Sequence, residues 1–325
     1  MAADHDGTTT GNGATADDGA TIGNGATTGN RATGGRSTGG RSTGSAGLAI
    51  GSGSRLTRIA VRAALLLGVL ISLFPFYWLV VMASGTTQDI YSYPPKLVPG
   101  PHLLDNMGRV LDTIDFFGSL WNTIAVSVAG TALVLFFDSL AAFAFAKYEF
   151  PGKKFLFGTL LVTYMIPAQL SLVPQFVTMA EFGWAGSLKA LIIPGAANAF
   201  GIFWMRQYAQ NSLPDELLDA GRIDGAGFFR LYWQVALPLF RPALAFLGIF
   251  TFIGLWNDYI WPLVVMINPD KVTLQVALAN LNVLYNADYA LVMAGALMSV
   301  IPLIIVFLIG ARHFLRDLAA GATKM

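Results

Sequence analysis

Long apolar stretches constrain the fold of this chain more than any other feature. Of its residues, 54% are hydrophobic and only 12% are charged, about half the charge of ordinary soluble domains. Several stretches approach the roughly 20 apolar residues that a helix needs to cross a bilayer. They cover about 59–83, 119–146, 155–179, 188–205, 243–267 and 289–311. The sequence therefore predicts an all-α protein of the plasma membrane, with about six transmembrane helices.

Several prolines lie inside these stretches, at Pro167, Pro174, Pro194, Pro262 and Pro302. A membrane helix tolerates proline where neighbouring helices or water satisfy the freed backbone groups. We therefore expect kinked core helices around a cavity.

Residues 1–54 differ from the rest, because they cycle through Gly, Thr, Asn, Ala and Ser with few large apolar side chains. Such a segment cannot bury enough apolar surface to offset the entropy of ordering. We expect a disordered tail over 1–54 and a six-helix domain over 55–325. A regulatory or partner-binding role for the tail is the alternative.

The positive charges predict the orientation. Of the 20 lysines and arginines, all except Lys96, Arg109, Lys189 and Lys271 fall on one side of the predicted spans. Cytoplasmic loops carry this excess, so both termini are expected in the cytoplasm. The formal net charge of +1 provides no general attraction to nucleic acid.

The longest predicted cytoplasmic connection, 207–241, begins with the signature of a short helix. Ser212 can cap it, and Pro214, Asp215 and Glu216 suit the first turn, where the helix dipole favours acids. We therefore expect a helix to start directly after Ser212.

Asp224-Gly225 then supplies a turn, and a second short helix is expected over about 226–238. This second part is rich in Phe, Tyr and Trp, and exposed apolar patches of that kind mark a partner or membrane surface. The alternative is that these side chains pack under the chain's own spans. We expect about half of them to do so.

Asp219-Ala220-Gly221, Asp224-Gly225-Ala226 and the later Leu237-Pro238 resemble the Glu-Ala-Ala loop of ABC importer permeases. Asp219 stands where that family usually has glutamate, and Gly221 where it usually has alanine. In the family, this loop docks in a cleft of the ATPase subunit. The resemblance therefore implies an ATPase-coupling loop made of Asp219, Ala220, Gly221, Asp224, Gly225 and Ala226.

Further segments are similar to the maltose-type carbohydrate permeases, over roughly 59–325. They are 256–262, Met293-Ala294-Gly295, 311–314 and Ala320-Gly321-Ala322. The resemblance implies the permease subunit of an ATP-driven sugar importer, which forms half of the pathway. Its implied partners are a second permease subunit, a dimer of ATP-binding subunits and an extracytoplasmic sugar-binding protein. ATP and Mg are expected on the ATPase and not on this chain, which has no Gly-x-x-x-x-Gly-Lys-Ser/Thr phosphate loop.

One segment is notable even apart from the family resemblance, because it places polar residues beside aromatic ones within a predicted span: Trp256, Asn257, Asp258 and Tyr259. A central Asp in a span costs about 2.5 to 3.5 kcal/mol. Polar groups beside aromatic rings suit a sugar, whose hydroxyls need hydrogen bonds and whose C–H faces stack on rings. These four residues are therefore candidates for the substrate pathway. The alternative is a polar helix-packing cluster beside an interfacial aromatic belt.

Asp138 is the other acid within a span, and a structural pairing role is favoured for it. An ion-coupled secondary transporter could instead use Asp138 and Asp258, and an intramembrane aspartyl protease could use the same pair. By their distance from the span ends, the two carboxyls lie in opposite halves of the membrane, which argues against a shared catalytic site. The chain has no cysteine, and we assign it no catalytic residue and no metal ligand.

Overall fold

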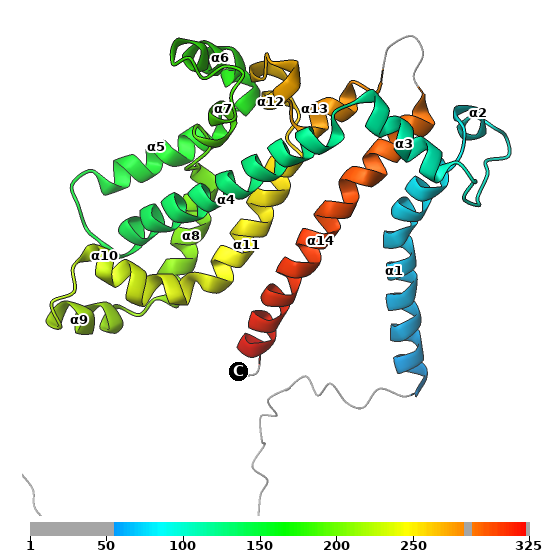
Figure 1. Cartoon of the computed structure of the whole chain (residues 1–325). Helices are drawn as coiled ribbons and strands as arrows, with labels where there is room; N and C mark the ends of the chain where they lie inside the picture. The colour runs from blue at the N-terminus through cyan, green and yellow to red at the C-terminus, as the bar shows by residue number, and fades with distance from the viewer. Residues whose placement is uncertain (1–54, 283–287, 323–325) are drawn as a thin grey trace, which may run out of the picture. The chain divides into compact units, whose positions relative to one another are not determined.

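A computed structural model describes residues 55–282 and 288–322 of the chain (Figure 1). All regular structure in these residues is helical, which confirms the all-α class. Among them, four helices are long and apolar enough to cross a membrane: Thr57–Ala83, Phe116–Lys147, Phe228–Trp256 and Tyr289–Leu308. A fifth crossing results if the bent pair Lys153–Met165 and Ala168–Glu181 counts as one span.

Apart from residues 55–59, the described residues belong to one compact unit within 60–325. The predicted tail over 1–54 lies outside the described residues, so its expected disorder stays a prediction.

The first span leads to an ordered connection and an amphipathic helix. The elements are α1 (Arg55–Ala83), α2 (Thr87–Ile90) and α3 (Leu103–Thr113). Asn106 on α3 is buried, and its side-chain amide donates to the carbonyl oxygens of Ala83 and Gly85, both at 2.9 Å. These carbonyls lie at the end of α1, where no helical partner is left for them. The two hydrogen bonds therefore fix α3 against the end of the first span.

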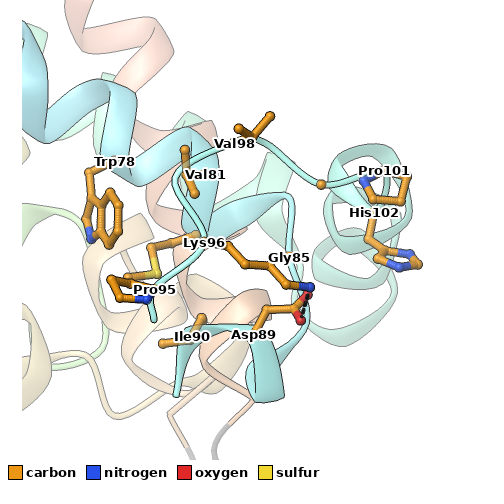
Figure 2. A pocket seen from close by; sticks show the side chains of 12 residues that line it. Trp78, Val81, Gly85, Asp89, Ile90, Pro95, Lys96, Val98, Pro101 and His102 are labelled. Carbon is orange, nitrogen blue, oxygen red and sulfur yellow. Dashed lines mark hydrogen bonds and ion pairs between the residues drawn. The ribbon is translucent and has the colours of Figure 1, made fainter. Parts of the chain in front are cut away.

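Beside this junction lies a hollow of about 130 Å³, shown in Figure 2. Trp78 lines it, together with the ion pair between Lys96 and Asp89 at 2.5 Å. The hydrogen bond from Lys96 lowers the pKa of the Asp89 carboxyl to about 2. The Asp89 carboxylate therefore stays ionised at neutral pH. No predicted site residue lines the hollow.

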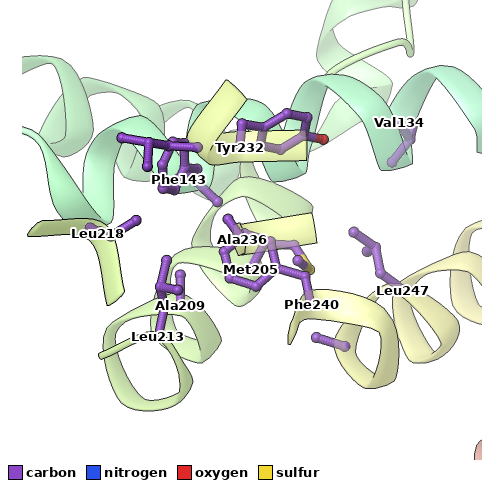
Figure 3. Packing of buried hydrophobic residues seen from close by; sticks show 13 residues of the cluster. Val134, Phe143, Met205, Ala209, Leu213, Leu218, Tyr232, Ala236, Phe240 and Leu247 are labelled. Carbon is purple, nitrogen blue, oxygen red and sulfur yellow. The ribbon is translucent and has the colours of Figure 1, made fainter. Parts of the chain in front are cut away.

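α4 (Phe116–Lys147) packs against both α8 (Ala199–Ser212) and α11 (Leu237–Trp256). Small residues permit close approach of membrane helices. A Cβ atom at Gly130 would lie 2.7 Å from Cδ1 of Leu255. Large side chains from these helices form the main apolar cluster, which includes Phe143, Met205 and Phe240 (Figure 3).

The third and fourth predicted spans are broken. The elements are α5 (Lys153–Met165), η1 (Ala168–Ser171), α6 (Leu172–Glu181), α7 (Lys189–Ile192) and α8. The third bends by 93° after Met165. The fourth, expected as one helix over 188–205, is not continuous, because the chain leaves helical structure between Ile192 and Ala199. Pro167 and Pro194 lie at these two breaks, so they interrupt helices rather than kink them.

The fifth span is longer than expected at its start. It begins as α10 (Phe228–Leu231), continues through a π-helical turn, η2 (Tyr232–Ala236), and runs on as α11. The second helix of the predicted loop is therefore the beginning of this span and not a separate element. The span ends at Trp256, short of the expected residue 267, and α12 (Ile260–Val265) follows after a break.

The last elements are η3 (Pro269–Lys271), α13 (Leu274–Ala279) and α14 (Tyr289–Ala322). A second apolar cluster joins α3, α4, α13 and α14 around Trp256. Thr123 of α4 supports it, because its hydroxyl accepts a 2.8 Å hydrogen bond from the backbone N–H of Leu274.

Candidate functional site

α9 (Asp215–Ile223) is the first helix of the predicted coupling loop, and the main apolar cluster anchors it. Leu218 points into this cluster, as Figure 3 shows, and is only 1% exposed. Leu213, just before α9, is buried in the same cluster. Burying one leucine side chain contributes about 1.5–3 kcal/mol. α9 is therefore held on the membrane helices rather than free in solvent.

The start of α9 differs from the prediction. Ser212 is not the cap but the last residue of α8, because that helix continues until Leu213 turns into the core. Pro214 occupies the cap position without a side-chain hydrogen bond. Asp215 instead pairs with Lys147 at the end of α4, at 2.8 Å, and the hydrogen bond from Lys147 lowers the pKa of Asp215. This ion pair ties the first turn of α9 to α4.

The turn after α9 depends on Gly225, which has a φ of +75°. Residues with a Cβ atom rarely adopt this conformation. The backbone N–H of Gly225 donates to the carbonyl oxygen of Arg222 at 3.0 Å, and that of Ala226 to the carbonyl oxygen of Gly221 at 2.9 Å. Both bonds satisfy carbonyl groups at the end of α9, so the turn is a defined helix termination.

Gly221 has a different role, because it lets α9 approach the fifth span closely. A Cβ atom at this position would lie 2.5 Å from Cδ2 of Leu231. Leu231 is 1% exposed and has little room to move. This contact explains why the loop carries glycine at Gly221 where the resembling family usually has alanine.

The outer face of the loop is exposed and mixed in character. Asp219 is 63% exposed and pairs with Arg222 at 2.7 Å. Ala220 and Asp224 are also exposed, and Ile223 has 87% of its surface free. Four of the six predicted coupling residues, Asp219, Ala220, Asp224 and Gly225, are exposed, whereas Gly221 and Ala226 lie against the core of the chain. The structure thus brings the six together on one small element.

The aromatic residues after the turn divide into two sets. Phe228 and Tyr232 pack on Phe143 of α4, with ring centroids 5.3 and 5.9 Å apart. Phe229 and Trp233 are 63% and 52% exposed. About half of this aromatic surface therefore supports the fold, as expected from the sequence, and half remains outward.

The second predicted site lies at the end of the fifth span. Trp256 is 1% exposed and stacks on Phe252, so it supports the site from behind. Asn257 is exposed, and its side-chain amide donates to the carbonyl oxygen of Ile253 at 2.9 Å. Tyr259 is 39% exposed. Asn257 and Tyr259 are therefore the two of the four that a solute could reach directly.

Asp258 has a local structural task. Its carboxylate lies close to the backbone N–H groups of Ile260 and Trp261. These are the first two donors of α12, which have no partner within the helix. Trp261 in turn donates from its indole N–H to the carbonyl oxygen of Ala190, at 3.0 Å. Asp258 therefore holds the chain where the fifth span breaks.

Asp138 is fully buried and binds the break in the fourth span. It accepts hydrogen bonds from the backbone N–H and the side-chain amide of Asn198, both at 3.0 Å. Asn198 then caps α8 by accepting from the backbone N–H of Gly201 at 2.8 Å. The sequence argument missed Asn198, although its place after Pro194-Gly195 was a usable cap signal. These contacts agree with the structural pairing role favoured for Asp138.

Comparisons with known proteins agree with this architecture. A protein-family profile, described as the binding-protein-dependent transport system inner membrane component, matches residues 139–319. The lactose transport system permease protein of Rhizobium radiobacter is 30% identical over 270 residues, which cover 83% of this chain and 97% of the relative. The sn-glycerol-3-phosphate transport system permease protein of Yersinia enterocolitica is 33% identical over 265 residues, covering 78% and 93%.

A solved structure is also similar. It is described as a bacterial ABC transporter involved in the import of the acidic polysaccharide alginate. The TM-score is 0.69 at 29% sequence identity, and the match covers 81% of this chain and 99% of the other. The fold is therefore that of a known importer subunit.

All these matches are to transport components, so they give no support to the ion-coupled or protease alternatives. The matches and the long apolar helices together identify this chain as a multi-pass membrane transport protein and not an enzyme. The chain belongs to the family of inner membrane components of binding-protein-dependent transport systems.

Proposed function

We propose that this chain is a permease subunit of an ATP-driven importer of saccharides, in which it forms half of the translocation pathway. The similarity to lactose and alginate transport proteins supports a saccharide as the transported substrate. Its proposed partners are a second permease subunit, a pair of ATP-binding subunits and an extracytoplasmic saccharide-binding protein. ATP and Mg would bind to the ATPase subunits.

The proposed coupling to the ATPase subunit rests on how α9 and its turn are anchored and exposed. The inner side of α9 is fixed by Leu218, by the contact between Gly221 and Leu231 and by the ion pair of Asp215 with Lys147. The outer side exposes Asp219 and Ile223. An element that is rigidly anchored inside and exposed outside can transmit movement of a docked partner to the spans. We propose that the ATPase subunit docks on this outer side.

The proposed substrate pathway rests on Asn257 and Tyr259. Both are accessible at a break of the fifth span, and they offer an amide and an aromatic ring with a hydroxyl. Trp256 and Asp258 would support them from behind, since Trp256 is buried and the carboxylate of Asp258 lies close to the first N–H groups of α12. A sugar needs both kinds of contact.

Cross-linking from single cysteines tests the docking directly, because the chain contains no cysteine of its own. Ile223→Cys, labelled with a maleimide photo-cross-linker in the assembled transporter, should capture the ATPase subunit. Asp105→Cys is the matched control, since Asp105 is 78% exposed but lies on α3. Capture of the ATPase by the control and not by Ile223→Cys would overturn the proposed docking site.

The same variants test the proposed orientation, with both termini in the cytoplasm. A membrane-impermeant maleimide added outside intact cells should label Asp105→Cys and leave Ile223→Cys unlabelled until the membrane is opened. The reverse labelling would refute this orientation.

A further inference from the structure

One side of the fifth span is exposed at its start and has no role assigned so far. Its residues recur at intervals of three or four along α10, η2 and the first turns of α11: Phe229, Arg230, Trp233, Gln234, Pro238 and Arg241. Residues with this spacing share one side of a helix. The other side of the same segment is buried in the main apolar cluster. We call the six exposed residues the α10–α11 face.

The two arginines of the α10–α11 face have no acidic partner among the described residues. Nε of Arg230 donates to the side-chain oxygen of Gln234 at 3.0 Å, which leaves the positive charge uncompensated. The side chain of Arg241 forms no ion pair or hydrogen bond with another described residue. By contrast, Lys147 and Arg222 nearby each pair with a carboxylate. The face therefore presents two free positive charges.

The length of the span places the α10–α11 face at an edge of the bilayer. The helical segment Phe228–Trp256 has 29 residues, so it is about 43 Å long. A hydrocarbon core is about 30 Å thick, so about 10 Å of the helix extends beyond it even at a tilt of about 20°. In the proposed orientation, this end is cytoplasmic. Phe229, Arg230 and Trp233 thus lie at the level of the lipid headgroups.

Arg241 lies deeper than the other charged residue of the face. It is about 22 Å from Trp256 along the helix, and therefore near the inner edge of the hydrocarbon core. Side chains on a helix lean toward its N-terminus, which is the cytoplasmic end here. The long side chain of Arg241 can therefore extend along the helix and bring its guanidinium to the headgroups.

The aromatic residues of the face suit the same level of the membrane. Trp233 is 52% exposed, and its ring stacks on Phe136 of α4 with centroids 6.2 Å apart and 27° between the ring planes. Its indole N–H has no hydrogen-bond acceptor among the described residues. Phe137, next to Phe136, is also exposed. An apolar ring with a polar N–H is typical of the membrane interface.

These features together favour a phospholipid over the other possible occupants. Water alone would satisfy the arginines but leave Phe229 and Trp233 exposed as an apolar patch. A protein partner without acidic groups would bury two unpaired charges, which is costly. A phospholipid offers both a phosphate for the arginines and an acyl chain for Trp233 and Phe137. The cytoplasmic leaflet is rich in anionic lipids, which attract basic residues near its surface.

We propose that the α10–α11 face binds an anionic phospholipid of the cytoplasmic leaflet. Arg241 contacts the phosphate from the core side, Arg230 contacts the headgroup from the water side, and the acyl chain lies along Trp233 and Phe137. The bound lipid holds the start of the fifth span at the membrane surface, directly after the coupling turn. This inference rests on the proposed orientation, and it adds a lipid to the partners of this chain.

The test measures lipid affinity directly. The complete transporter, purified in detergent, is titrated with phosphatidylglycerol that carries a fluorophore on one acyl chain, and separately with phosphatidylcholine of the same chains. Fluorescence anisotropy reports binding. The unaltered protein should prefer phosphatidylglycerol. Arg230→Gln combined with Arg241→Gln should lower the affinity for phosphatidylglycerol by about 5-fold or more, as expected for lost charge-assisted hydrogen bonds, and should abolish the preference.

Two further pairs of substitutions control for charge and for folding. Arg58→Gln with Arg62→Gln also removes two exposed arginines, at the predicted cytoplasmic end of α1, and should keep the lipid preference. Arg230→Lys with Arg241→Lys retains both charges and should keep most of it. An equal loss of preference in the two glutamine pairs would show attraction by net charge alone and would overturn the site.

The remaining outcomes also decide the proposal. Equal affinities of the unaltered protein for the two lipids would overturn it. So would loss of the second permease subunit from the purified complex with Arg230→Gln and Arg241→Gln, because the face would then be covered by protein. The proposed function is judged separately, since absence of ATP-driven saccharide uptake with an intact lipid preference would refute the function and leave the lipid site. Reversed labelling of Ile223→Cys would refute the orientation on which the site rests.

Discussion

Replacing Gly225 by valine probes the coupling turn. Gly225 has a φ of +75°, and this left-handed conformation costs an L-residue about 1–2 kcal/mol. Since 1.4 kcal/mol corresponds to a factor of ten, the equilibrium constant that favours the correct turn over other loop conformations should fall by about 5-fold to 30-fold. A Cβ atom at this position meets nothing within 4 Å. The effect should therefore stay in the turn and leave the membrane helices intact.

Two further variants separate the causes. Gly225→Asn should keep the turn, because asparagine adopts positive φ more readily than other residues, but it adds a side chain. Gly227→Val is the matched valine control, since Gly227 has a φ of −76° and nothing within 4 Å of its Cβ position. We expect Gly227→Val to fold normally.

The assay is retention of the ATPase subunit in a pull-down, together with saccharide uptake by cells with equal amounts of permease in the membrane. Gly225→Val should lose at least 5-fold in both. Loss in Gly225→Asn as well would show that a side chain at this turn collides with the partner. Full retention and full uptake in Gly225→Val would refute the reasoning that this turn seats the ATPase.

Three further predictions concern the remaining site residues and the tail. Asp219→Ala should weaken ATPase retention less than Gly225→Val, because Asp219 is 63% exposed and exposed ion pairs contribute less than about 1 kcal/mol; a larger loss in the same pull-down would show that this carboxylate is buried by the partner. Asn257→Ala should lower uptake about 5-fold to 150-fold through a lost hydrogen bond of about 1–3 kcal/mol, without loss of assembly, whereas unchanged uptake in both Asn257→Ala and Tyr259→Ala would favour a packing role for this segment. A chain that starts near Gly51 should transport like the full chain at equal expression, and loss of most uptake would contradict a dispensable tail.

The elements that depend on local pattern could be predicted from the sequence. Long apolar runs predicted α1, α4 and the start of α14 to within a few residues. The helix signals at Pro214, Asp215 and Glu216 located α9, and Asp224-Gly225 located its turn. In each case a short segment contains the cause of its own structure.

The breaks could not be placed in the same way. Proline within an apolar run is compatible with a continuous helix, as at Pro302 in α14, and with a break, as at Pro194. At Pro194 the break is stabilised by Asp138, which lies 60 residues before Asn198 in the chain. Likewise, the second part of the loop joins the fifth span because Tyr232 packs on α4, where its hydroxyl lies 2.7 Å from that of Ser139. These contacts are remote in sequence, so a pattern within one segment does not reveal them.

ATP-driven accumulation in proteoliposomes tests the central claim most directly. The vesicles contain this chain, its second permease subunit and the ATPase subunits, with the saccharide-binding protein and a labelled saccharide outside. We predict accumulation that requires hydrolysable Mg-ATP inside, the binding protein outside and the ATPase subunits. Accumulation driven by an imposed proton or sodium gradient in vesicles that lack the ATPase would contradict the account and favour an ion-coupled carrier.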